Sequence, residues 1–325
     1  MFTLEKAPDH PFRILNLTDP QLSEEDWNSW KAHLLRGTIN RLVRSVRPDL
    51  ITITGDISYG GHYDAYRKFR DFIDGYGIKW APVFGNHDNQ EGAETSSAQA
   101  DILLEAKNIL FEKNAPALGC GNYVIRITEN GEPVYALFML DTHDRDDFTE
   151  PDGKISRRWA HLNDAQLDWY GKTAKEIGTK HAILMHIPFK TFETTFDEAW
   201  NGKFDPKDVK SREDSRSPRY WNEGFKDFCG VKYEGIGSYP VDMGEFDRIR
   251  EVGLCDLVLV GHDHINDLMM KKDGVRLVYS LKTGAGCYWD SRLNGGTVIR
   301  VCRNGSHVRH LDIDPREFAT ESELS

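Results

Sequence analysis

The sequence has few cysteines and no long apolar runs. Its five cysteines, among 325 residues, are odd in number and scattered, without a Cys-x-x-Cys pair, which indicates reduced thiols rather than a disulfide framework. No stretch approaches the roughly 20 apolar residues of a membrane span. The first residues carry no basic segment followed by an apolar run, so we expect no signal peptide. These absences predict a cytoplasmic protein that has no membrane partner.

Positive charge is also scarce, since 41 Lys and Arg face 52 Asp and Glu for a formal net charge of −11. This balance argues against a nucleic-acid polymer or an anionic membrane as partner. It does not exclude a phosphorylated substrate, because bound cations reverse the potential inside a pocket. We predict a single domain over residues 1–325, with an insertion or lid at about 190–240 and a frayed acidic tail from about 315. No pattern indicates an oligomeric state.

Apolar runs alternate with amphipathic stretches in the first third of the chain. Ser23-Glu24-Glu25-Asp26 has the form of a capping box before one expected helix, and Asn163 with Gln166 resembles another before a later helix. Such alternation predicts parallel strands joined by helical crossovers. Asn130-Gly131 predicts a hairpin between two further strands. We therefore expect an α/β protein with two sheets packed face to face and helices outside. The strands that precede polar loops are expected at 12–17, 50–54, 80–84, 180–185 and 255–260.

Each of these five strands is followed by residues of the types that bind metal ions in proteins. Carboxyl ends of parallel strands meet at one edge of a sheet, where ligands collect. Oxygen and imidazole donors without thiolates suit Mn, Fe or Zn. Each residue alone is more often structural, as a turn acid or a surface histidine, but their joint occurrence argues against an all-structural interpretation. The set is Asp19, Asp56, Asn86, His87, His186, His262 and His264.

Two metal ions about 3.5–4 Å apart can share one carboxylate and hold a hydroxide that is nucleophilic at neutral pH. Phosphate-ester hydrolysis needs such a nucleophile, charge neutralisation and protonation of the leaving oxygen. His87 adjoins Asn86 without being required as a ligand, so we interpret it as a general acid or phosphate donor. We interpret Asp88 as the carboxylate that orients His87, with a helix-cap role as the alternative.

Five stretches of the chain together resemble the five ordered motifs of the calcineurin-like metallophosphoesterases. They are Asp19, Gly55-Asp56, Gly85-Asn86-His87-Asp88, His186 and Gly261-His262-Asp263-His264. The resemblance implies a four-layer α/β/β/α sandwich of two mixed sheets with a dinuclear metal centre. It implies that metal 1 takes Asp19, Asp56 and His264. Metal 2 would take Asp56, Asn86, His186 and His262, while His87 stays uncoordinated over the phosphate.

One motif departs from the family, because most members have Asp-x-His where this chain has Asp19-Pro20-Gln21. Manganese-dependent ADP-ribose and CDP-alcohol diphosphatases carry Asp-x-Gln, with the Gln near the first metal. Purple acid phosphatases carry Gly-Asp-x-x-Tyr, whose tyrosinate binds ferric iron. This chain has both Gln21 and Tyr59, so either is a candidate ligand of metal 1, and Tyr59 is equally a packed aromatic. The small intracellular purple-acid-phosphatase-like branch of the family is the most similar, on the basis of Glu234-Gly235-Ile236 and residues 261–267.

These features predict a metal-dependent phosphomonoesterase that acts on a small phosphorylated substrate or a phosphoprotein. One alternative, motivated by Gln21, is a phosphodiesterase or diphosphatase on a nucleotide-like substrate. Another is a metal-binding scaffold without catalysis. His143, Asp144 and Arg145 are weaker candidates for substrate contact, because a solvated acidic loop explains them better.

Overall fold

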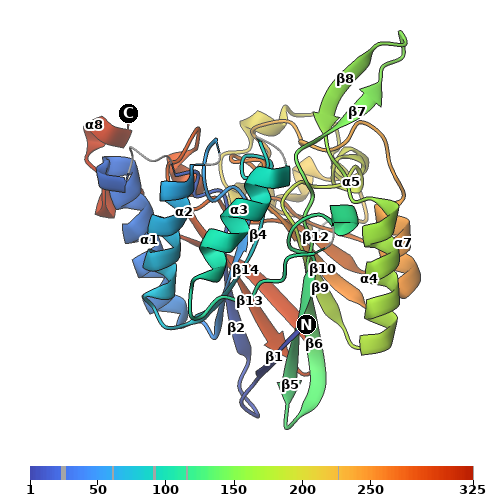
Figure 1. The fold of residues 1–325 in the computed structure, drawn as a ribbon. Helices are drawn as coiled ribbons and strands as arrows, with labels where there is room; N and C mark the ends of the chain where they lie inside the picture. The colour runs from blue at the N-terminus through green and yellow to red at the C-terminus, as the bar shows by residue number, and fades with distance from the viewer. Residues whose placement is uncertain (23–26, 61, 91–92, 115, 226, 325) are drawn as a thin grey trace.

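The computed structural model describes residues 1–324 apart from 23–26, 61, 91–92, 115 and 226. Two large mixed sheets lie between two groups of helices (Figure 1), as the sequence predicted. One core cluster joins side chains from both sheets, among them Leu15, Ile53, Leu137 and Leu259. The capping box predicted at Ser23–Asp26 lies outside the described residues.

The smaller sheet has five strands in the order β14-β13-β2-β3-β4. Strand β3, between β2 and β4, is rich in β-branched residues and every residue in it is buried, as expected for a strand covered on both faces. β2, β3 and β4 run parallel, whereas β13 pairs antiparallel with both β2 and β14. The bounds are β2 (Phe12–Leu17), β3 (Leu50–Thr54), β4 (Lys79–Val83), β13 (Gly295–Cys302) and β14 (Gly305–Asp312).

The larger sheet has seven strands in the order β1-β5-β6-β9-β10-β12-β11. β6, β9, β10 and β12 run parallel. The predicted β5–β6 hairpin is confirmed: Asn130 and Gly131 both have positive φ, which matches strand twist in a two-residue turn. The bounds are β1 (Phe2–Glu5), β5 (Tyr123–Glu129), β6 (Glu132–Met139), β9 (His181–Leu184), β10 (Cys255–Val260), β11 (Met269–Lys272) and β12 (Val275–Tyr279).

Helices cover the outer face of each sheet, with α1, α2 and α3 on one side and α4 and α7 on the other (Figure 1). The predicted capping box before α4 is confirmed, since Asn163 and Gln166 exchange side-chain and backbone hydrogen bonds. The bounds are α1 (Trp30–Val46), α2 (Tyr63–Asp74), α3 (Ala93–Leu104), α4 (Asp164–Ile177), α5 (Thr191–Ala199), α6 (Arg212–Ser215), α7 (Glu245–Val252) and α8 (Glu321–Leu324).

A two-stranded arm projects from the body where the sequence predicted an acidic loop (Figure 1). It consists of β7 (Arg145–Thr149) and β8 (Ile155–Trp159), joined by a turn in which Gly153 has φ 83°. The loop prediction was wrong because the strands carry charged residues on both faces and therefore show no apolar alternation. The Asp152-Gly153 pair was the turn signal available in the sequence.

The sequence also predicted an insertion or lid at about 190–240 and a frayed acidic tail from about 315. A second core cluster of buried side chains packs on the larger sheet, and residues 190–240 contribute Phe192, Phe196, Trp221 and Phe228 to it. A lid role for this segment stays a prediction. The acidic tail is not frayed at Phe318, whose ring packs so closely on α1 that a Cβ at Gly37 would lie 2.4 Å from it. In the described residues, no helix combines the length and the apolarity needed to span a bilayer.

Candidate metal centre

The side chains predicted at the strand ends converge beyond β2, β3, β4, β9 and β10. Three of them form one group, which we call the first donor set: Asp19, Asp56 and His264 are buried, and their ligand atoms all lie within 4.8 Å of one another. His264 Nε2 lies 3.4 Å from Asp19 Oδ1. That oxygen is buried and accepts no hydrogen bond. A buried carboxylate oxygen without a partner is unfavourable unless a cation neutralises it, so these residues fit a metal ion.

A second donor set adjoins the first through Asp56 and comprises Asp56, Asn86, His186 and His262. The Asn86 side-chain oxygen lies 3.1 Å from His186 Nε2 and 2.8 Å from His262 Nδ1. His186 Nε2 is also 3.3 Å from Asp56 Oδ1. The other ring nitrogen of His186 lies 2.7 Å from the Thr54 carbonyl oxygen, which directs Nε2 into the group. The two sets therefore have the shared carboxylate that a dinuclear site requires.

The charges of this cluster perturb one another strongly. Burial alone would raise the pKa of Asp56, but the charge of His186 and its hydrogen bond lower it to about 2. The pKa of Asp19 lies well below its usual range, because His186 and His264 outweigh its burial. Burial would lower the pKa of His186, yet Asp56 and Asp19 raise it to about 10. The two buried carboxylates thus create a negative potential at this position, which favours a bound positive charge.

The backbone at these positions is unusual. Asp19, Gln21, Asp56 and His262 all have φ between 46° and 78°, in the left-handed region that non-glycine residues seldom adopt. Such conformations cluster at functional sites, where the surrounding structure holds them. Gly85 is required for a different reason, since a Cβ there would lie 2.2 Å from Asp56 Oδ1. The turn before Asn86 therefore passes directly against the shared carboxylate.

His87 lies beside the donor sets with its side chain 21% exposed. Its Nε2 is 4.0 Å from Asp56 Oδ2, and its Nδ1 is 3.0 Å from the Gln90 side-chain oxygen. Its backbone N–H donates to Asp56 Oδ1 at 2.9 Å. The imidazole is thus fixed at the edge of the site with one nitrogen facing the shared carboxylate.

Asp88 does not orient His87, contrary to the interpretation from the sequence. Its carboxylate accepts hydrogen bonds from the backbone N–H groups of Gly85, Ile57 and Ser58 and from the Tyr66 hydroxyl. Burial, followed by the charge of Asp56, raises the pKa of Asp88 to about 7. Asp88 joins the loop after β3 to the loop after β4, and Gln90 is the partner of His87. Sequence proximity suggested the wrong contact because the turn directs the two side chains apart.

Gln21 and Tyr59 occupy different places near the first donor set. The Gln21 side-chain amide donates from Nε2 to Asp56 Oδ2 at 2.9 Å. Its oxygen faces Lys282, whose Nζ lies 3.3 Å away and also donates to the Asp19 carbonyl at 2.8 Å. Tyr59 is 44% exposed, and its ring lies 4.5 Å from that of His87. A ligand role for either residue stays a prediction.

Aromatic residues outside the motifs lie against the donor sets, and of Trp159 and Tyr288 sequence reasoning missed Trp159. Trp159 of β8 stands edge-on to His262 at 4.4 Å between ring centres, and the Arg145 guanidinium lies 3.9 Å from the Trp159 ring centre. Tyr288 stacks on His264 at 4.1 Å, and its hydroxyl donates to Glu234 at 2.6 Å. The arm therefore contacts the second donor set through Trp159. The loop that carries Tyr288 contacts the first donor set.

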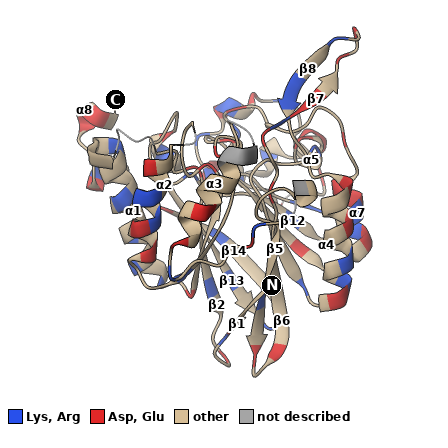
Figure 2. Cartoon of the chain, in the orientation of Figure 1, with Lys and Arg blue, Asp and Glu red and all other residues tan. Residues whose placement is uncertain are grey.

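Charge near the arm is mixed rather than uniformly basic. Figure 2 shows basic residues on β8, and there Arg157 and Arg158 pair with Asp147 and Glu150.

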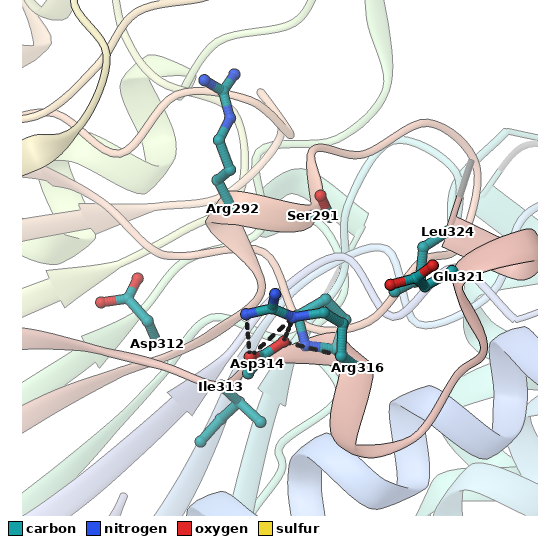
Figure 3. Close-up of a pocket in the computed structure, with 9 residues that line it drawn as sticks. Ser291, Arg292, Asp312, Ile313, Asp314, Arg316, Glu321 and Leu324 are labelled. Carbon is teal, nitrogen blue, oxygen red and sulfur yellow. Dashed lines mark hydrogen bonds and ion pairs between the residues drawn. The ribbon is translucent and has the colours of Figure 1, made fainter.

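A cavity of about 700 Å³ lies elsewhere, between the loop at Ser291 and the C-terminal residues (Figure 3). Arg316 in its wall pairs with Asp314. That cavity contains none of the donor residues.

Comparison with known proteins identifies the family. The calcineurin-like phosphoesterase family matches residues 12–266, which include both donor sets. The chain belongs to that family. The chain is 25% identical over 291 residues to probable inactive purple acid phosphatase 14 of Arabidopsis thaliana, covering 81% of this chain and 65% of the relative. It is also 25% identical to the phosphatase DCR2 of Saccharomyces cerevisiae, covering 74% of this chain and 41% of the relative.

Solved structures share the fold of this chain. A dimetal phosphatase from Danio rerio superposes with a TM-score of 0.52 at 14% identity, over 92% of this chain and 99% of the other. The purple acid phosphatase PPD1 of yellow lupin gives a TM-score of 0.50 at 11% identity, over 95% of this chain and 52% of the other. At these identities the likeness establishes the fold alone.

Proposed function

We propose that this chain is a metal-dependent phosphoesterase that hydrolyses phosphate monoesters at a dinuclear centre. The observation that carries the proposal is the pair of donor sets joined through Asp56, with the unpartnered Asp19 Oδ1 in one of them. Mn, Fe or Zn bound there would polarise phosphoryl oxygens and lower the pKa of water. The substrates are small phosphorylated molecules or phosphoproteins.

The chain's own residues divide the remaining work. Gln21 and the His87 backbone N–H hold Asp56 from two sides, which fixes the shared carboxylate. His87 Nε2 faces the site from its edge, so the proton for the leaving oxygen is assigned to this atom. His87 Nε2 lies 4.0 Å from Asp56 Oδ2 and the side chain is 21% exposed, so the imidazole is accessible to a substrate at the edge of the site.

Substrate recognition is assigned to the base of the arm. Asp144 is near enough to His87 and Asp56 for their charges to influence its pKa, which burial raises above its usual value. Arg145 lies on Trp159, with its Nε 3.9 Å from Asp144 Oδ1 at ion-pair distance and its Nη1 donating to the Arg157 carbonyl at 3.5 Å. These contacts use only part of its five N–H donors. Its N–H donors are therefore well placed for an anionic group on the substrate, and Trp159 offers a flat apolar wall.

A comparison of two aryl phosphates tests this function. The purified protein is loaded in turn with Mn²⁺, Fe³⁺/Zn²⁺ or Zn²⁺, and turnover of p-nitrophenyl phosphate is compared with that of bis(p-nitrophenyl) phosphate. We expect faster hydrolysis of the monoester. Equal or faster hydrolysis of the diester would contradict the monoesterase assignment and favour the diesterase or diphosphatase alternative.

The second candidate is a metal-binding protein without catalysis. It is supported by the name of the Arabidopsis relative, which describes that protein as probably inactive, and by the absence of the usual histidine at position 21. The retention of His87 in an accessible position favours catalysis. Full metal loading without turnover of any phosphate ester would establish the non-catalytic alternative.

A further inference from the structure

Lys282 is a buried cation at the edge of the first donor set. It follows β12, and only 2% of its surface is exposed. Its backbone is fixed on both sides, because Gly295 donates to the Lys282 carbonyl and Thr283 donates to the Thr18 carbonyl. The ammonium is therefore held in place rather than drawn in by a flexible loop.

The polar partners of this ammonium are neutral oxygens. Lys282 Nζ donates to the Asp19 backbone carbonyl and the Gln21 side-chain oxygen. Across the described residues, no carboxylate oxygen lies within the 4.0 Å of an ion pair with Nζ. An unpaired buried ammonium is unfavourable, and Asp19 and Asp56 attract this one at longer range. Lys282 and a metal in the first donor set would thus draw on the same two negative charges.

Lys282 also determines which way Gln21 faces. With its oxygen held by the ammonium, Gln21 presents its amide nitrogen to Asp56 Oδ2. Turning the oxygen toward a metal would deprive Lys282 of one acceptor and Asp56 of one donor. In the described part of the chain, no hydrogen bond or ion pair joins a lysine or arginine to the second donor set.

We propose that Lys282 is a positioning residue that keeps the Gln21 oxygen away from the first donor set and makes this set the weaker, exchangeable metal position. The inference rests on the proposed dinuclear centre. It goes further in assigning unequal affinities to the two positions and in naming their cause. Gln21 then acts as a hydrogen-bond donor to the shared carboxylate, not as a metal ligand.

Calorimetric titration of the metal-free protein with Mn²⁺, with bound metal counted after dialysis, tests this inference. We expect two Mn²⁺ per chain, with dissociation constants separated by at least about tenfold. His264→Ala should remove only the weaker binding step, and Asn86→Ala only the tighter one. The reverse assignment, or two equal steps in the unmodified protein, would overturn the inference while leaving the dinuclear function intact. No Mn²⁺ binding at all would overturn both.

Substitutions at the cation identify its role. Lys282→Met should tighten the weaker step by at least about tenfold and change the tighter step less than about twofold. Lys282→Arg keeps the charge and should keep the separation. If Lys282→Met fails to fold, judged by circular dichroism, Gln21→Glu is the second variant, because its carboxylate neutralises the ammonium and should also tighten the weaker step. A folded variant of either kind with both constants unchanged would overturn the inference.

Discussion

Asn86 Oδ1 lies 2.8 Å from His262 Nδ1, although the two residues are 176 positions apart in the chain. This contact joins the end of β4 in one sheet to the end of β10 in the other. The second donor set therefore spans the interface between the two sheets, so its geometry depends on how the sheets pack.

Replacing Asn86 with alanine tests this set directly. Asn86→Ala removes the only neutral oxygen among its four members, and we expect metal binding at this position to weaken by at least about tenfold. Metal content after dialysis measures the effect. Asn89→Ala is the matched control, because Asn89 lies in the same loop and donates to the Gly85 carbonyl. Unchanged metal content in Asn86→Ala would remove Asn86 from the ligands.

His87→Ala should lower kcat on an aryl monoester by about a hundredfold or more. Metal content should stay unchanged, because His87 lies outside both donor sets. Steady-state kinetics with metal analysis measures both quantities. His307→Ala is the control, since His307 is exposed on β14 and belongs to neither donor set. Loss of metal in His87→Ala would show that His87 is a ligand instead.

Tyr59→Phe separates the two interpretations of that residue. Because Tyr59 packs by its ring on His87 and is 44% exposed, we expect the variant to retain both metals and its absorption spectrum. A purple iron-loaded protein that loses its colour on this substitution would identify Tyr59 as a tyrosinate ligand. Tyr59→Ala should instead raise KM or lower kcat, because it removes the surface that supports His87.

Asp88→Ala should destabilise the fold, because three buried N–H groups and the Tyr66 hydroxyl lose their acceptor. We expect a loss of about 3 kcal/mol in the free energy of unfolding, measured in urea on the metal-free protein. Tyr66→Phe removes one of these bonds and should cost about 1 kcal/mol. A loss of activity in Asp88→Ala with unchanged stability would restore the catalytic role inferred from the sequence.

Acid should destabilise the protein partly through His181. Burial lowers the pKa of His181 to about 4, below the value of about 6.5 in an unfolded chain. Between these values the unfolded state binds more protons, so stability falls as the pH drops below about 6.5. His181 should contribute about 2 kcal/mol to the difference between pH 7 and pH 5.

His181→Gln is the test, because glutamine can still bond Tyr170 but does not titrate. Denaturant unfolding at pH 7 and pH 5 should show a smaller pH-dependent loss of stability in the variant. An identical loss in both proteins would exclude His181 as a contributor.

The location of the site was predictable because it follows from local signals. An apolar strand followed by a polar turn is visible in the sequence, and parallel crossovers bring such turns to one edge. The contacts of Asp88 and Gln21 were not predictable, because they depend on side-chain directions set by loops. Lys282 lies more than 15 residues beyond the last motif in an apolar segment, where nothing distinguishes it from a surface lysine. The arm was missed because its strands have no buried face.

The left-handed backbone at Asp19, Gln21, Asp56 and His262 limits how this site can be transferred to another protein. Each such conformation is disfavoured by about 1–3 kcal/mol, so the surrounding sheets must supply that energy. Grafting the same side chains onto relaxed loops would aim them elsewhere, because φ sets the direction of each Cα–Cβ bond. An engineered scaffold would have to reproduce the strained turns before the choice of metal-binding residues mattered.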